Sequence, residues 1–367
     1  MSKSNISAMP AIPDYTQSDP VSPSQAAARP VRVGVIGYGY WGPNLVRNFT
    51  RAASCEVIAV ADCNSDQLIR VNEDFPGVAT SNDYRKLLHD PDIEAVAIAT
   101  PVASHFSLAA KALRAGKHVL LEKPLAASLQ EAENLLELAE KYNRIVMVDH
   151  TYLFTGAVEM MKKLVGSGEL GDVLYFDSTR INLGLFQRDV NVVWDLAPHD
   201  LSILLHVLEK KPVAVSALGA THAGTSMENL AYLTLTFDDN TLAHFHVNWL
   251  APRKVRQIII GGEKKMLVFD DMESNEKIKI YDKGITVGSP DKEAFYNTLI
   301  QYRIGDMWAP RLDPTEALLK ECSYFAECIR EDKAPFNDAS SGLDVVRILD
   351  ASSRSIRKMG QLTRISY

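Results

Sequence analysis

The sequence predicts an α/β fold in two domains: a parallel-sheet domain comes first, and an α+β domain with an open, largely antiparallel sheet follows it. The chain has 367 residues, whereas a single domain rarely grows beyond roughly 250–300 residues. From residue 31 to about residue 150, short β-branched runs alternate with amphipathic stretches, a pattern typical of strands joined by helical crossovers. Beyond residue 151, closely spaced strands separated by short turns replace this alternation.

The start of the chain and its composition narrow the class of protein. Residues 1–30 are rich in Ser, Pro and Ala and carry no apolar period, so we expect a flexible N-terminal tail. A net charge of −7 argues against a broad surface for nucleic acid. We expect no membrane helix, because the apolar runs are shorter than the ~20 residues that cross a bilayer, and no secretory signal. Four cysteines without a C-x-x-C pair suit a reducing compartment, and we expect a cytoplasmic protein.

Five apolar runs predict the strands of the first domain. They are rich in Val, Ile and Ala, as strands buried on both faces are, and they cover 31–37, 56–62, 95–100, 118–123 and 145–150. Amphipathic stretches predict helices over 43–52, 66–74, 104–115 and 128–142. Gly116 stands where a helix end favours glycine, and Ser128 stands where the next helix needs an N-cap. Right-handed crossovers then place the strands in one parallel sheet.

The turn after the first strand has the spacing of a phosphate-binding loop. It reads G-x-G-x-x-G and opens the first helix. Its six residues are Gly37, Tyr38, Gly39, Tyr40, Trp41 and Gly42. The first glycine permits a tight turn, the second lets the backbone approach a pyrophosphate, and the third lets helix and strand pack closely. The context of strand, turn and helix therefore predicts that all six residues contribute to a dinucleotide site.

An acidic residue at the end of the second strand supports the same site. Asp62 lies twenty residues after Gly42, where a carboxylate accepts hydrogen bonds from the adenine ribose. We therefore predict a Rossmann dinucleotide-binding domain over residues 31–150. A carboxylate at this position repels a 2′-phosphate, and no arginine follows it directly. The sequence thus favours NAD over NADP as the cofactor.

The second domain is expected over residues 151–367, with helices on one face of its sheet. Two helices are predicted first, over about 157–165 and 196–208. Strands follow over 212–221, 230–237, 241–249, 255–261, 265–270 and 277–281. Short turns such as Asp238-Asp239-Asn240 join them, which suits antiparallel meanders. Two last helices, about 314–330 and 342–358, are expected to pack back on the chain.

Three further motifs resemble those of one enzyme family. Ala99–His105 reads A-T-P-x-x-x-H, residues 122–124 read E-K-P after the fifth strand, and Asp195–His199 reads D-x-x-x-H. With the glycine loop, they make residues 31 to about 358 similar to the Gfo/Idh/MocA family of sugar and cyclitol oxidoreductases. The resemblance implies a Rossmann domain that binds a nicotinamide cofactor and a second domain that forms one wall of the substrate site. It also implies a homo-oligomer, a dimer or tetramer, that associates through the open sheet.

The resemblance implies roles for single residues as well. Lys123 is similar to the lysine that hydrogen-bonds the reacting hydroxyl, and His199 resembles the proton acceptor, with Asp195 one helical turn away to hold or polarise it. Removal of a hydride needs such a base for the proton and a cation for the developing alkoxide. Asp195 and His199 also have the spacing of an ordinary ion pair on a helix surface. The implied cofactor-side residues are Thr100, His105, Glu122 and Lys123.

Several strings are similar to family members that act on nucleotide-activated sugars, among them W-D-L-A-P-H-D-L-S over 194–202. Residues expected to line the sugar site from a loop before the catalytic helix are Arg180, Asn182 and Trp194, together with His199 on the helix itself. Candidates for a diphosphate are Arg253, Lys254, Arg256, Arg303 and Arg311, although arginines equally often form surface ion pairs. The favoured activity is oxidation of a ring hydroxyl, the 3-hydroxyl, of a UDP-N-acetylglucosamine-type sugar. Such a 3-keto product normally feeds an aminotransferase in polysaccharide biosynthesis.

Two alternatives stay open. A free-sugar or inositol dehydrogenase has the same fold, and a non-catalytic dinucleotide-binding regulator uses the same scaffold. The presence of Lys123, Asp195 and His199 together argues against the regulator. His244 and His246 share one strand face but have no evident third ligand, so we predict no metal site.

Overall fold

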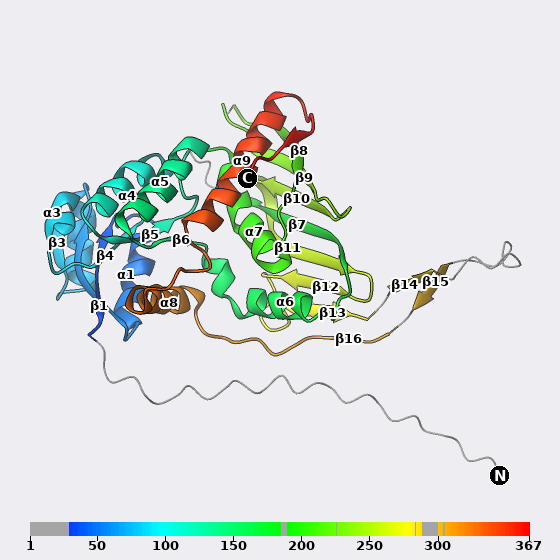
Figure 1. Ribbon diagram of the computed structural model, residues 1–367, viewed down its shortest axis with the longest axis horizontal. Coiled ribbons are helices and arrows are strands. Elements are labelled where there is room, and N and C mark those ends of the chain that lie inside the picture. Colours follow the sequence, from blue (N-terminus) through cyan, green and yellow to red (C-terminus); the bar gives the residue numbers. More distant parts are fainter. Residues whose placement is uncertain (1–28, 185–188, 225, 283, 288–299, 304) are drawn as a thin grey trace, which may run out of the picture.

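The structure is a computed structural model, and it describes residues 29–184, 189–224, 226–282, 284–287, 300–303 and 305–367. The expected tail over 1–30 lies outside the described residues, apart from its last two. A six-stranded and a nine-stranded sheet, each with helices against it, lie next to one another (Figure 1). No helix in the described ranges is long and apolar enough to cross a membrane.

The first sheet is parallel throughout. Its strands are β1 (Val31–Ile36), β2 (Cys55–Ala61), β3 (Ala79–Ser81), β4 (Ala95–Ile98), β5 (His118–Glu122) and β6 (Val146–Asp149). They lie in the order β3-β2-β1-β4-β5-β6, and every neighbouring pair is parallel. The chain order therefore reverses between β1 and β4. Doubly wound sheets bind ligands at such a reversal, outside the carboxyl ends of the strands.

Helices cover both faces of this sheet because its strands are apolar on both sides. The helices are α1 (Gly42–Arg51), α2 (Ser65–Asp74), α3 (Tyr84–His89), α4 (His105–Arg114) and α5 (Leu129–Tyr142). On β4, Ala95 and Ala97 belong to one apolar core together with Phe49 of α1. Val96 and Ile98 alternate with them and belong to a second core, which contains residues of α4 and α5. The prediction of strands buried on both faces is confirmed.

The ends of the helices follow the sequence signals. Ser128 caps α5, because its Oγ accepts a hydrogen bond from the backbone N–H of Glu131 at 3.3 Å. Gly116 follows α4 with a φ of +77°, which glycine adopts without strain. Strand β3 and helix α3 are not predicted, because β3 has only three residues and α3 only six, too few for a period to be recognised.

The second sheet has nine strands. They are β7 (Val173–Leu183), β8 (Ala214–Ala220), β9 (Leu230–Thr236), β10 (Leu242–Asn248), β11 (Leu250–Gly262), β12 (Met266–Asp270), β13 (Ile278–Tyr281), β16 (Met307–Trp308) and β17 (Thr363–Arg364). Their order is β16-β13-β12-β11-β7-β10-β9-β8-β17. Only the central pair, β7 with β10, is parallel among these strands. The expected largely antiparallel sheet is therefore confirmed.

The central strand β7 is the main element that the sequence does not predict. Its buried face carries Ser178 and Arg180 beside Phe176, and these polar residues obscure the apolar period that marks a strand. Arg180 and Asn182, expected on a loop, lie on β7 instead. A separate two-stranded sheet, β14 (Gly284–Val287) with β15 (Ile300–Arg303), extends away from the body (Figure 1).

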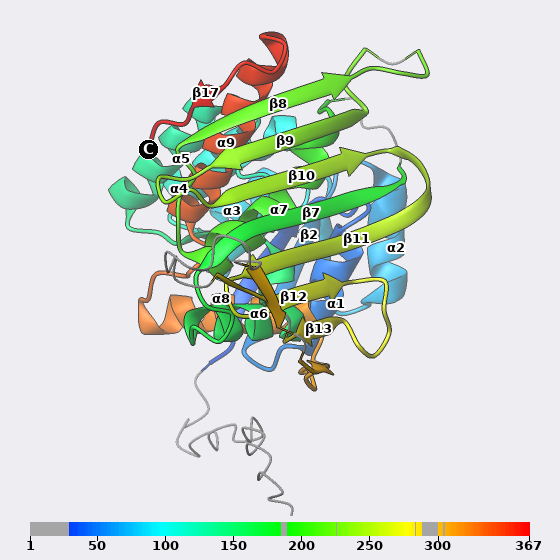
Figure 2. The same cartoon turned by 90° about the vertical axis from the view of Figure 1, so that its right-hand side faces the viewer.

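Helices cover one face of the second sheet and leave the other open. Figure 2 views the open face, with α6 (Gly156–Gly166) and α7 (Val192–Leu208) behind the strands. α7 begins four residues before the predicted start, because Asn191 caps it: its Oδ1 accepts the N–H of Trp194 at 3.1 Å. The longer helix adds a first turn that contributes to the site described below.

The last two helices return to the first domain, as predicted. α8 (Ala317–Glu331) packs against α1, and α9 (Ala339–Arg357) packs against both α5 and β8 (Figure 1). Ala339, Leu343 and Val346 of α9 belong to the same apolar core as α4 and α5. α9 therefore contacts both domains and holds them next to one another.

Candidate active site

Glycine is required at two corners of the loop between β1 and α1. Gly37 has a φ of +97°, and a Cβ atom there would lie 2.5 Å from the main-chain oxygen of Ala99. A Cβ atom at Gly42 would clash with the main-chain oxygen of Gly37. Gly39, by contrast, faces open space. No side chain in the described ranges caps α1 at Trp41. Pro43 has no N–H, and Asn44 donates its N–H to the main-chain oxygen of Trp41 at 2.9 Å, so the N–H of Gly42 is the donor of this first turn that is left for an anion.

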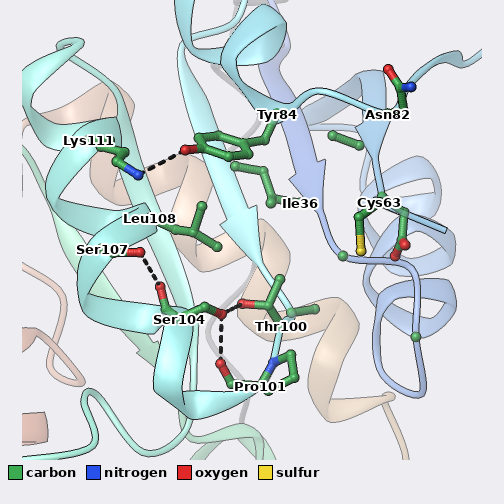
Figure 3. Close-up of a pocket in the computed structure, with 15 residues that line it drawn as sticks. Ile36, Cys63, Asn82, Tyr84, Thr100, Pro101, Ser104, Ser107, Leu108 and Lys111 are labelled. Carbon is green, nitrogen blue, oxygen red and sulfur yellow. Dashed lines mark hydrogen bonds between the residues drawn. The ribbon is translucent and has the colours of Figure 1, made fainter.

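Backbone donors fix the carboxylate of Asp62 beside this loop. Its Oδ2 accepts the N–H of Tyr38 at 2.7 Å, and its Oδ1 accepts the N–H of Asn64 at 2.8 Å. A cavity of about 430 Å³ opens here, bordered by Gly39, Asp62 and Thr100 (Figure 3). The half-buried carboxylate of Asp62, which borders the cavity, and the open space at Gly39 fit a dinucleotide, with its ribose at Asp62 and its pyrophosphate at Gly39.

The far wall of the cavity carries residues that the sequence analysis does not single out. Lys111 donates a hydrogen bond from Nζ to the hydroxyl of Tyr84 at 2.9 Å, and Asn82 and Cys63 border the same space (Figure 3). Cys63 is exposed, whereas Cys55 is buried. No motif marks these positions, because α3, α4 and the end of β2 bring them together only in the fold.

The side chain of Tyr38 turns away from the cavity. It is fully buried, and its hydroxyl donates to Asp74 of α2 at 3.2 Å. Burial, followed by the contact with Asp74, raises the pKa of Tyr38 to about 12. The expected cofactor contact is corrected, since Tyr38 holds the loop to α2 and its N–H is already used by Asp62. Tyr40 and Trp41 are exposed, with their rings edge to face at 5.5 Å.

His105 is a second cofactor-side prediction that the structure corrects. Its ring is buried between two carbonyl oxygens, with Nδ1 2.9 Å from that of Pro124 and Nε2 2.9 Å from that of Thr100. Burial lowers the pKa of His105. Both ring nitrogens are therefore occupied inside the protein. His105 connects the cavity residue Thr100 to the E-K-P segment and has no free nitrogen for a cofactor.

The E-K-P and D-x-x-x-H motifs meet, although they come from different domains. Lys123 follows β5 and donates from Nζ to the main-chain oxygen of Asp195 at 2.8 Å and to its Oδ1 at 3.4 Å. The other carboxylate oxygen of Asp195, Oδ2, accepts the indole N–H of Trp249 at 3.1 Å. Both Lys123 and Asp195 have mostly buried side chains. The two motifs therefore lie in one cluster of side chains.

His199 lies one turn further along α7. Its Nδ1 is buried and has no partner among the described residues, and its ring stands edge to face with Tyr152 at 5.3 Å. Burial, and then the charges of Lys123, Arg180 and Arg256, hold the pKa of His199 well below its usual value. The imidazole is therefore neutral at neutral pH. The expectation that Asp195 holds His199 is corrected, because both carboxylate oxygens of Asp195 face Lys123 and Trp249.

Arg180 is buried against an acidic partner. Its Nε and Nη2 donate to the two carboxylate oxygens of Asp200 at 2.9 and 2.6 Å. Arg180 Nη1 and Arg256 Nη1 both donate to the hydroxyl of Tyr152, at 3.3 and 2.6 Å. The prediction that Arg180 binds the sugar directly is corrected: it positions Tyr152, which contacts His199. Tyr152 is not predicted from the sequence, because its position just after β6 matches no motif.

The other predicted substrate residues differ in accessibility. Trp194 donates its indole N–H to Ser353 of α9 at 2.9 Å, so its polar atom stabilises the helix packing and is not free for a sugar. Asn182 is half-buried near the end of β7. Arg253 and Lys254 are exposed on β11, whereas the side chain of Arg303 lies outside the described residues.

Glu122 is buried at the end of β5, and its nearest charged neighbours are Asp149 and Lys123. Burial, and then the charge of Asp149, raises the pKa of Glu122 well above its usual value. Elsewhere in the described ranges, no group of three His, Cys, Asp or Glu side chains is arranged to hold a metal ion. His246, one of the pair on β10, stacks on Tyr232 at 4.5 Å.

The chain is similar to several known proteins, whose names give different substrates. The chain is 27% identical to UDP-N-acetylglucosamine 3-dehydrogenase of Acidithiobacillus ferrooxidans, over 69% of this chain and 78% of that protein. It is 25% identical to scyllo-inositol 2-dehydrogenase (NAD(+)) of Bacillus subtilis, over 86% of this chain and 92% of that protein. A crystal structure of an oxidoreductase from Magnetospirillum magnetotacticum matches with a TM-score of 0.75 at 30% identity, covering 88% of this chain and 99% of that one.

Family-level matches cover both domains. Residues 31–150 match the oxidoreductase family with the NAD-binding Rossmann fold, and residues 158–268 match the GFO/IDH/MocA C-terminal domain. The first match contains the glycine loop, Asp62 and Lys123, and the second contains Asp195 and His199. The chain is therefore an NAD-binding oxidoreductase that belongs to the Gfo/Idh/MocA family.

Proposed function

We propose that this chain oxidises the 3-hydroxyl of a nucleotide-activated sugar of the UDP-N-acetylglucosamine type, with NAD as the hydride acceptor. The observation that carries the proposal is the hydrogen-bonded contact of Lys123 with Asp195, one helical turn before His199. The first domain contributes a cation and the second contributes a base. A hydroxyl held between the two domains meets both groups, and bound NAD supplies the hydride acceptor.

His199 has the properties of the general base. It is neutral, because burial and the neighbouring cations lower its pKa, and a neutral imidazole accepts a proton. Since Nδ1 is enclosed, Nε2 is the ring nitrogen that takes the hydroxyl proton. The ammonium group of Lys123 stabilises the negative charge that develops on the oxygen. Asp195 keeps that ammonium in place through its two oxygen acceptors.

Two observations favour a nucleotide sugar as the substrate. One named relative is a UDP-N-acetylglucosamine 3-dehydrogenase. In addition, Arg253 and Lys254 are exposed on β11, and cations of this kind attract a diphosphate. The inositol and free-sugar alternative is favoured by the inositol dehydrogenase among the relatives. A non-catalytic regulator has no use for a base beside Lys123.

Formation of NADH, followed by its absorbance, tests the substrate class. UDP-N-acetylglucosamine, free N-acetylglucosamine and scyllo-inositol are each offered to the purified protein with NAD, and His199→Ala serves as the inactive control. We expect the highest kcat/KM for the nucleotide sugar. Turnover of the inositol without turnover of the nucleotide sugar assigns the alternative. NAD binding without turnover of any sugar or inositol favours the regulator.

We also propose that copies of the chain associate through the open face of the second sheet. The side chains of β9 alternate, so Tyr232 lies exposed on that face between the buried Ala231 and Leu233. Leu218 of the neighbouring β8 is its register partner and is exposed as well. Large apolar side chains on an open sheet face are typical of a contact surface between subunits.

A further inference from the structure

Three buried carboxyl groups form a continuous chain behind Lys123. Glu122 ends β5 and Asp149 ends β6, and the two residues are register partners in adjacent parallel strands. Glu321 approaches Asp149 from α8, a helix of the second half of the sequence. Their exposed fractions are 8%, 4% and 0%. None of the motifs in the sequence connects these three positions.

Few hydrogen-bond donors surround these carboxyl groups: the backbone N–H of Lys123 serves Glu122, and the hydroxyl of Thr151 neighbours Glu321 as well as Asp149. Thr151 donates its hydroxyl to Asp149 at 2.5 Å, and Asn337 donates its amide to Glu321 Oε1 at 3.3 Å. Glu321 Oε2 and Asn337 Oδ1 are buried and have no partner in the described ranges. A buried acceptor without a donor is costly. Protons on the carboxyl groups themselves supply the missing donors, as in other carboxyl pairs that share a proton.

The surroundings add little positive charge. Lys123 is the cation beside Glu122, but it already pairs with Asp195. His150 lies close to Lys123 and is neutral, because burial and then the charge of Lys123 lower its pKa to about 3. On α8, Cys322 neighbours Glu321, and burial raises the pKa of its thiol. Burial, and then the charge of Asp149, also raises the pKa of Glu321 well above its usual value. Glu122 and Glu321 therefore hold protons when no cofactor is bound.

The position of Glu122 connects this chain to the cofactor. The adenosine end of the dinucleotide fits beside Asp62 at β2, so its nicotinamide end extends past the β1–β4 reversal toward the carboxyl ends of β5 and β6. Glu122 and Asp149 end those two strands. The nicotinamide ring is cationic in NAD+ and neutral in NADH. A cation next to Glu122 favours its ionised form.

We propose that Glu122 and Glu321, which both neighbour Asp149, exchange one proton with solvent according to the charge of the bound nicotinamide. The protonated chain releases this proton when NAD+ binds and retains it when NADH binds. During oxidation His199 takes the proton that leaves the substrate hydroxyl. Once the nicotinamide is neutral, the carboxyl groups regain one proton and His199 releases one, so one turnover still liberates one proton in total. The three residues thus link the affinity for each cofactor form to pH.

The direction of the effect follows from the charges. A carboxyl group whose pKa is raised in the free protein loses its proton more easily beside NAD+. The carboxyl group therefore has a lower pKa beside NAD+ than in the free protein. The affinity for NAD+ increases as pH rises through the interval between these two pKa values, and the affinity for NADH changes less. For one full proton, the ratio of the two Kd values changes by up to about tenfold per pH unit.

Isothermal titration calorimetry in buffers of different ionisation enthalpy counts the protons released on binding. For the unaltered protein we expect more protons released with NAD+ than with NADH. In Glu122→Gln this difference falls to near zero. In Glu321→Gln it moves to lower pH, because removal of a neighbouring carboxyl group lowers the pKa of Glu122. Glu327→Gln, a surface position on the same α8, is the control and leaves the difference unchanged.

Equal proton counts for NAD+ and NADH in the unaltered protein, across the accessible pH range, overturn the proposal without any variant. A Glu122→Gln protein that keeps the full difference overturns it as well. Circular dichroism checks that each variant is folded. The measurement needs no substrate, so its outcome is independent of which sugar the enzyme oxidises.

Discussion

The surroundings of the His199 imidazole keep the ring neutral. Burial is the largest cause of its lowered pKa, and the positive charges of Lys123, Arg180 and Arg256 lower it further. The same cations would resist protonation of the ring during the reaction, so the proposed base is a weak one. Asp200 and Asp271 moderate this effect, since they pair with Arg180 and Arg256.

Replacement of either central side chain should lower turnover strongly. A positioned acid or base contributes typically about 10²–10⁴-fold, so His199→Ala and Lys123→Met should each reduce kcat by that order. The double variant should be little worse than the poorer single variant, because the two groups act as one unit. Steady-state kinetics with the best substrate measures all three. Near-wild-type turnover of a folded His199→Ala protein would refute the proton-acceptor role.

Asp62 offers a test of cofactor choice at the other end of the crevice. Asp62→Ser removes a carboxylate that faces the ribose, and one charge-assisted hydrogen bond is worth roughly 1.5–3 kcal/mol. We expect NAD to bind about ten- to a hundredfold more weakly, with a smaller effect on NADP. Fluorescence titration measures both Kd values, and the exposed Asp66→Ser on α2 is the control. Equal use of NAD and NADP by the unaltered protein contradicts the assignment.

At the scale of elements, α9 shows how closely the two domains fit. Gly342 lies near its N-terminus, and a Cβ atom there would lie 2.7 Å from Cγ2 of Val148 and 3.3 Å from Cβ of Leu125. Both neighbours are core residues of the first domain. Glycine therefore sets the distance between α9 and β6, and through it the position of the second domain.

A methyl group at this contact should destabilise the protein. We expect Gly342→Ala to lower the free energy of unfolding by about 1–3 kcal/mol, the usual cost of overpacking. Gly166→Ala, at the end of α6, meets no atom within 4 Å and should change stability by no more than about 1 kcal/mol. Chemical denaturation measures both variants. A Gly342→Ala protein as stable as Gly166→Ala would show that α9 can shift to make room.

Sequence patterns predict a strand best where all of its buried side chains are apolar. All strands of the first sheet except β3 are rich in buried apolar residues, and the glycine loop and the E-K-P segment directly follow two of them, so their positions are predictable. In β7 the buried Arg180 and Ser178 mix polar residues into the core face, and the strand is missed. The link from Glu122 to Glu321 spans most of the chain, and only the return of α8 brings these residues together.

At the scale of the whole molecule, one face of the second sheet is not covered by any helix of the described residues (Figure 2). Tyr232 stacks on His246 in the middle of that face. If copies associate there, Tyr232→Arg should introduce a buried charge and reduce the mass of the assembly. Light scattering after gel filtration measures this mass. Ile69→Arg on α2, also exposed, is the control. A monomeric unaltered protein would contradict the association.

The N-terminal segment gives a second prediction for the whole molecule. Residues 1–30 lack a periodic apolar face, so their deletion should leave both the thermal midpoint and the affinity for NAD nearly unchanged. Thermal denaturation and NAD titration of the shortened chain measure the two quantities. A large loss of either would mean that the segment belongs to the folded structure.

The return of α9 to the first domain also affects how the chain folds during synthesis. The ribosome delivers β1 to β6 first, but Leu343 and Val346, which complete the core around α4 and α5, emerge last. Until then the nascent first domain exposes an apolar surface of the kind that chaperones recognise. The core of the first domain can therefore be completed only after α9 has been synthesised, so a chain that ends before α9 lacks both a finished core and the contact of this helix with the two domains.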